Sequence, residues 1–184
     1  MAVSKPHFQG GGLKRFKSIT LYLPFTCPSL KTPPITMWPS AITAYFHYLS
    51  FMLAFGAVAV ELLTLRKELS IAEAWRILIA DVIYGISASL VLFTGALRVI
   101  YFGKGADYYL GNPIFYTKVG LFLLVGALSI YPTISFVSWI GSLREGKVPQ
   151  LGQTQFQWLS WLIRIELVGW MGLPLLAALL ARSA

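Results

Sequence analysis

Residues 119–143 read VGLFLLVGALSIYPTISFVSWIGSL and contain no charged side chain. About 20 consecutive apolar residues in an α-helix cross the hydrocarbon core of a bilayer, and a helix satisfies its own backbone polar groups there. Three other stretches of the chain are similarly long and apolar. The sequence therefore predicts an all-α protein, a transmembrane four-helix bundle, with helices at about 39–65, 77–102, 114–143 and 156–181.

The composition supports a membrane protein. Hydrophobic residues make up 57% of the chain and charged residues 12%, whereas soluble domains carry roughly a quarter charged residues. A transmembrane β-barrel is excluded, because barrel strands alternate apolar and polar residues and these stretches are continuously apolar. The net charge of +8 comes from cations dispersed among the loops and the N-terminal segment. We therefore expect the lipid bilayer as a partner and no nucleic acid.

Residues 1–36 differ from the rest of the chain, since they are rich in Lys, Ser, Thr, Pro and Gly. Three interpretations are open: a disordered tail, a targeting segment, or translation upstream of a start at Met37. A secretory signal needs an apolar core of about 7 to 15 residues, and Pro24 interrupts the short apolar run 19–25. Because the first span closely follows Met37, we favour the upstream start and assign 37–184 to the transmembrane domain.

Two layers of polar side chains are expected inside the bundle. Ionisable groups are costly in a membrane and mark candidate sites. Since adjacent helices run antiparallel, Glu61 comes level with Asp81. One layer comprises Glu61, Asp81, Arg164 and Glu166. Alternatively, these residues pair or extend toward the membrane surface. Arg164 and Glu166 point to nearly opposite faces, so either the last helix begins near Leu162 or one of the pair meets another subunit.

The second layer lies on the side of the chain termini and surrounds His47, the only histidine in the predicted spans. The connection 103–117, GKGADYYLGNPIFYT, is expected to form a structured cap above it. Cations and aromatic rings suit an anionic, partly apolar ligand, and a neutral histidine can coordinate a metal. The candidate ligand-binding residues are Arg98, Tyr101, Lys104, Asn112 and Lys118. The alternative is an interfacial loop above a hydrogen-bonded histidine.

Haem b is the cofactor that this layer suggests, with His47 as the metal ligand, because an axial histidine can hold haem iron. The chain's other histidine, His7, lies in the N-terminal segment. One chain therefore supplies one axial histidine within the bundle. A second ligand would come from another chain, from Met52 or from water, or the iron would have no second ligand. The sequence contains no recognisable catalytic triad, Cys/His metal spacing or phosphate-binding loop, so no catalytic residue is assigned.

Residues 95–140 read GALRVIYFGKGADYYLGNPIFYTKVGLFLLVGALSIYPTISFVSWI. This stretch resembles a bacterial family of four-helix membrane proteins of unknown function that is frequent in cyanobacteria. The resemblance covers about residues 38–181. The family is distantly similar to copper-resistance-protein-D-like proteins and to HemJ-type protoporphyrinogen oxidases. That resemblance matches His47 and Lys118 to residues linked to haem binding and activity in the HemJ-type proteins. It implies a bacterial plasma or thylakoid membrane protein.

Three functions remain open from the sequence. The first is a small redox or tetrapyrrole-binding membrane protein with its site at His47. The second is a non-enzymatic membrane subunit or assembly factor that meets a second copy or another membrane protein through its last helix. The third is a transporter of small ions such as copper, which the few membrane methionines and the lack of an inverted repeat do not favour. Whether the protein is an enzyme is left open.

Overall fold

The structure, a computed structural model, describes residues 34–183. Every regular element in this part of the chain is helical, which confirms the all-α prediction. Four helical stretches are long and apolar enough to cross a membrane: 37–64, 71–102, 113–144 and 153–182. The elements are α1 Pro34–Thr64, α2 Ile71–Leu97, the π-helix η1 Arg98–Phe102, α3 Ala106–Leu110, α4 Pro113–Ser138, α5 Ile140–Arg144 and α6 Gln153–Arg182.

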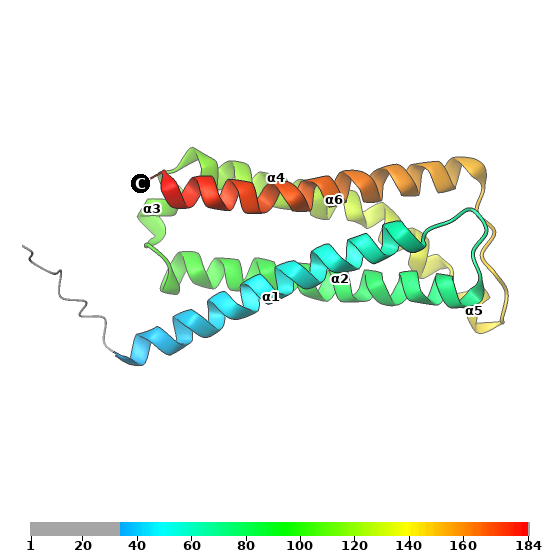
Figure 1. The fold of residues 1–184 in the computed structure, drawn as a ribbon, viewed down its shortest axis with the longest axis horizontal. Helices are drawn as coiled ribbons and strands as arrows, with labels where there is room; N and C mark the ends of the chain where they lie inside the picture. Colours follow the sequence, from blue (N-terminus) through cyan, green and yellow to red (C-terminus); the bar gives the residue numbers. More distant parts are fainter. Residues whose placement is uncertain (1–33, 184) are drawn as a thin grey trace, which may run out of the picture. The chain divides into compact units, whose positions relative to one another are not determined.

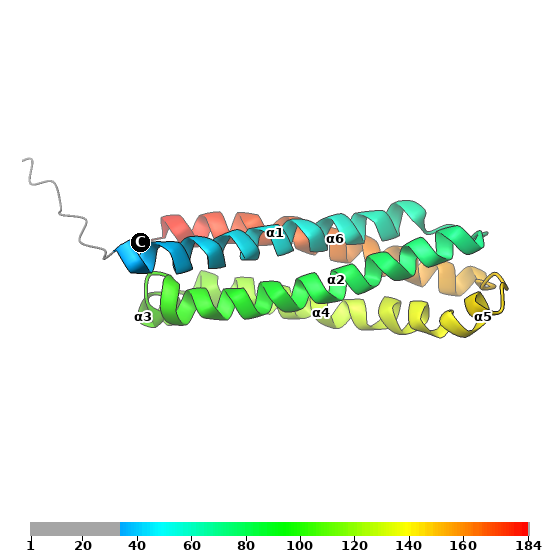
Figure 2. The same cartoon turned by 90° about the horizontal axis from the view of Figure 1, so that it is seen from below.

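The four long helices α1, α2, α4 and α6 lie side by side along the length of the molecule (Figures 1 and 2). Each packs on the next in chain order, and α6 packs on α1, so the four form a closed ring. The short α3 lies at the end that holds the C-terminus, and α5 lies at the opposite end (Figure 1). The predicted four-helix bundle is confirmed.

Local capping explains where two of the helices begin. Ser70 and Glu73 form a capping box, in which each side chain accepts a hydrogen bond from the other residue's backbone N–H, and α2 begins at Ile71. At the start of α4, the Asn112 side-chain oxygen accepts from the Ile114 N–H at 2.9 Å. Pro113 follows Asn112, at a position where its missing N–H costs nothing.

The last helix is continuous from Gln153 to Arg182 and runs through Pro174. The alternative in which this helix begins near Leu162 is therefore wrong. The expectations for the N-terminal segment fall on residues 1–33, outside the described residues. Pro34–Thr36 belong to the first turn of α1.

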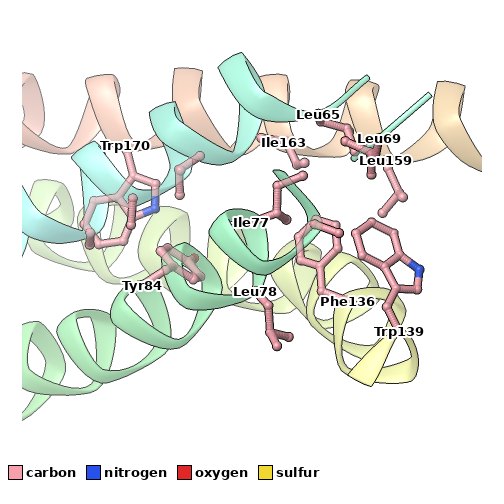
Figure 3. Close-up of a cluster of buried hydrophobic side chains, with 14 of the residues drawn as sticks. Leu65, Leu69, Ile77, Leu78, Tyr84, Phe136, Trp139, Leu159, Ile163 and Trp170 are labelled. Carbon is pink, nitrogen blue, oxygen red and sulfur yellow. The ribbon is translucent and has the colours of Figure 1, made fainter. Parts of the chain in front are cut away.

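An aromatic layer crosses the interior of the bundle, formed by one ring from each long helix: Phe51, Tyr84, Phe122 and Trp170. Trp170 is 1% exposed and lies at its centre, with ring centroids 5.2 Å from Phe51 and 6.0 Å from both Tyr84 and Phe122. Figure 3 shows Trp170 on α6 and Tyr84 on α2 reaching into the space between the helices. The aromatic layer therefore ties all four helices together.

Helices α4 and α6 approach each other closely at two glycines. A methyl group added at Gly169 would overlap the Val125 side chain, and one added at Gly172 would lie 3.2 Å from Leu121. Glycine at such points lets membrane helices pack backbone to side chain, where van der Waals contact stabilises their association. This contact fixes α6 at the level of the aromatic layer.

Candidate functional site

His47 of α1 is held by a hydrogen bond to α2. Its Nδ1 lies 2.9 Å from the Thr94 hydroxyl oxygen, and that hydroxyl donates its single proton to the Leu90 backbone oxygen. Since the Thr94 oxygen can then only accept, the proton of the neutral imidazole sits on Nδ1. The other ring nitrogen, Nε2, keeps its lone pair. This is how metal-binding histidines are oriented, with one nitrogen anchored and the other free to coordinate.

Two cations from different helices lie near this histidine. Arg98 of η1 and Lys118 of α4 are both within electrostatic range of His47, and both side chains are half-buried. The Arg98 guanidinium lies 5.1 Å from the centroid of the Tyr48 ring, a cation–π contact that restrains it. The structure thus brings together the histidine and two of the five candidate ligand-binding residues.

A groove of about 480 Å³ opens on the side of α1 that carries His47. Ser40, Ala44 and His47 follow steps of four and three residues, so they share one face of the helix. The groove is lined by Met37, Ser40, Ala41, Ala44, Tyr101, Phe102 and Gly103. Its lining on α1 lies about one to three turns before His47, toward the start of the helix.

The groove is lined across from α1 by the end of the π-helix η1 and by Gly103, which follows it. Arg98–Phe102 form a π-helix, a form often found at functional sites. Directly after it, a methyl group added at Gly103 would overlap the Arg98 backbone oxygen and lie 2.7 Å from the Tyr109 hydroxyl. Gly95, three residues before Arg98, lies against the imidazole, since a methyl group there would lie 3.4 Å from His47 Cε1.

The remaining candidates have other surroundings. Lys104 lies 4.4 Å from the centroid of the Tyr108 ring and donates to the Ala181 backbone oxygen at 3.4 Å. Asn112 caps α4 through its oxygen, and its amide nitrogen donates to Ser183 at 2.6 Å. These residues fasten the connection between η1 and α4 to the end of α6. Tyr101 is 71% exposed and lines the groove.

The acid layer, defined by Glu61, Asp81 and Glu166, lies on the other side of the aromatic layer. These side chains are 1%, 5% and 1% exposed, come from three helices and lie within electrostatic range of one another. Thr133 of α4 donates a hydrogen bond to Asp81 Oδ1 at 2.7 Å. Arg164 is exposed, as its two-residue spacing from the buried Glu166 requires.

Neither layer is a multidentate metal centre. In residues 34–183, no three His, Cys, Asp or Glu side chains are grouped so that they could hold one metal ion. His47 therefore has no cluster of His, Cys, Asp or Glu ligands around it in this part of the chain, and the three acids do not converge on one point.

Several residues around His47 were not predicted from the sequence. Thr94 lies four residues before Arg98, on the same face of α2, so helical spacing could have identified it. Tyr48 directly follows His47, and its contact with Arg98 depends on how α1 crosses η1. No sequence pattern in this chain predicts how the two helices cross.

Comparison with known proteins places the chain in a family. Residues 39–184, which include all four long helices except the first turns of α1, match the family described as "Predicted membrane protein (DUF2214)". No curated protein and no solved structure matches the chain significantly. The chain belongs to the DUF2214 family of multi-pass membrane proteins.

Proposed function

We propose that the end of the bundle around His47 binds a metal tetrapyrrole of the haem b type, and that the protein is a small redox or haem-binding protein of a bacterial plasma or thylakoid membrane. The observation that carries the proposal is the Nδ1 hydrogen bond to Thr94, which leaves Nε2 free to coordinate. When bound, the group would supply one-electron chemistry. His47 would hold its metal from one side.

The surroundings of His47 suit the rest of such a ligand. Arg98 and Lys118 would pair with carboxylates of the propionate kind by charge-assisted hydrogen bonds. The groove of about 480 Å³ lies beside these residues, toward the start of α1, and is not itself lined by His47, Arg98 or Lys118. His47 and Lys118 are also the residues that carry the resemblance to the HemJ-type proteins. Charge and coordination therefore favour one ligand class.

Titration of the detergent-purified full chain with haemin tests this function. The wild-type protein is expected to shift the Soret band, and His47→Ala to abolish the shift. Thr94→Val removes the partner that orients the imidazole and should weaken binding about 10- to 100-fold. His7→Ala, which changes the chain's other histidine, is the matched control. Equal binding by wild type and His47→Ala would rule out His47 as the ligand.

A second candidate function is that of a membrane subunit that assembles through α6. Arg164 lies eleven residues into this helix and is exposed, and no carboxylate within residues 34–183 lies within 4.0 Å of it. An outward-facing arginine in a span is stabilised by an acid or backbone carbonyl of a neighbour, and we propose a second copy of the chain. Arg164→Gln should lower the mass measured by light scattering in detergent, whereas Arg144→Gln should not. An unchanged mass would argue against assembly through Arg164.

A further inference from the structure

The acid layer holds three carboxyl groups that have no positive partner. The only ion pair in residues 34–183 joins Lys147 and Glu145 near α5, well away from Glu61, Asp81 and Glu166. Three negative charges buried side by side would cost far more free energy than the fold could recover, since an uncompensated buried charge already costs several kcal/mol. Something must therefore neutralise them.

Other polar atoms in the same space also lack partners. The Tyr84 hydroxyl and the Trp170 indole N–H are 4% and 1% exposed by residue and lie close to each other, with Ser129 of α4 also near the Tyr84 hydroxyl. Neither has a partner in hydrogen-bonding geometry within residues 34–183. Tyr84 lies one turn from Asp81 on α2 and within electrostatic range of Glu61 and Glu166. Trp170 lies one turn from Glu166 on α6. One carboxyl oxygen each of Glu61 and Glu166 is likewise unpartnered.

The polar atoms around the three acids indicate that protons, rather than a metal cation, neutralise them. An indole N–H is a donor only and repels a cation, but it can donate to the carbonyl oxygen of a protonated carboxyl. The three acids also do not converge on a single point. Protonated carboxyls need no such convergence, because each one carries its own proton.

We propose that Glu61, Asp81 and Glu166, together with Tyr84 and Trp170, form a proton-binding site inside the membrane. Each carboxyl is neutral with its proton bound and becomes a carboxylate when it releases that proton. The groups that face the site are the Asp81 and Tyr84 side chains from α2, Thr133 and Ser129 from α4, and Glu61, Glu166 and Trp170 from α1 and α6. The site is independent of any ligand at His47.

The aromatic layer determines from which side of the membrane protons can reach this site. Its four rings lie between the acids and His47, so they separate the acids from the end of the bundle that holds the C-terminus. On the other side, Glu61 lies three residues before the end of α1, which is about 5 Å along the helix. We expect protons to exchange with the side of the membrane that holds the α1–α2 connection.

Infrared spectroscopy of the full chain in nanodiscs at neutral pH tests the site. A carboxylic acid C=O band is expected, and it should shift in D₂O. Glu61→Gln and Glu166→Gln should each remove part of the band, and the double variant most of it. Glu145→Gln, at an exposed ion-paired position, is the control and should leave the band unchanged.

Wild-type protein provides a second readout that needs no variant. Dicyclohexylcarbodiimide is apolar and reacts with protonated carboxyls, so Glu61 or Glu166 should be labelled far more than Glu145, and less as the pH is raised. Two results would overturn the proposal. One is a spectrum with no acid band and no labelling of the three acids. The other is a band that appears only when sodium is replaced by choline, which would identify a cation site instead.

Discussion

Trp170→Ala is expected to lower the free energy of unfolding of the bundle by about 3 to 5 kcal/mol, the usual cost of truncating a buried aromatic side chain to alanine. Trp170 is 1% exposed and contacts a ring from each of the other three long helices. Its removal leaves a cavity and also breaks three aromatic pairs. Unfolding in SDS micelles, followed by far-UV circular dichroism, measures the change.

Trp161→Ala is the matched control, because Trp161 lies on the same helix and is 61% exposed. It faces outward, where lipid or detergent replaces what the side chain contacts. We expect a change of well under half that of Trp170→Ala. Equal losses for both variants would mean that the aromatic layer does not hold the four helices together.

Gly169→Val should be the next most damaging single change, with an expected loss of about 1 to 3 kcal/mol from overpacking. Even the first carbon of the new side chain would overlap Val125, and the valine carries two more. Helices α4 and α6 would have to separate. The same unfolding assay reports the loss, and disulfide cross-linking between cysteines placed at Leu121 and Gly172 would report the separation.

Gly126→Val on α4 separates overpacking from helix propensity. Both variants replace a helical glycine by the same β-branched residue, but a side chain at Gly126 meets nothing within 4 Å. Gly126→Val should therefore be close to neutral. If it destabilises the protein as much as Gly169→Val does, the close approach of α4 and α6 is not the cause.

The helices could be predicted from the sequence because a bilayer imposes a simple rule on length and polarity. Residues 119–143 satisfy that rule with no charge at all. Boundaries were less accurate where polar residues stabilise helix ends. The capping box at Ser70 starts α2 at Ile71, before the apolar run that was predicted to begin at 77. Helix α6 begins at Gln153, in a segment of mixed polarity before the predicted start at 156.

The candidate sites were only partly predictable, for a related reason. Antiparallel spans fix which residues are level, so Glu61 with Asp81 and His47 with Arg98 follow from counting along the helices. Which atom of His47 is anchored depends on the rotation of α2 about its axis, which a single sequence does not specify. The aromatic layer was missed because its four rings are far apart in the chain and lie among many other aromatic residues.

The two layers make the two ends of the bundle chemically different. One end holds a histidine and two cations, the other holds buried acids, and Trp170 separates them. Each site can be tested alone, because no residue is shared between them.

The absorption spectrum of the full chain, purified from membranes without added ligand, tests the central claim most directly. We predict a Soret band that is present in the wild-type protein and in His7→Ala and absent in His47→Ala. A wild-type protein that shows no Soret band as purified, and gains none when haem is added, would contradict the assignment of His47 as a haem ligand.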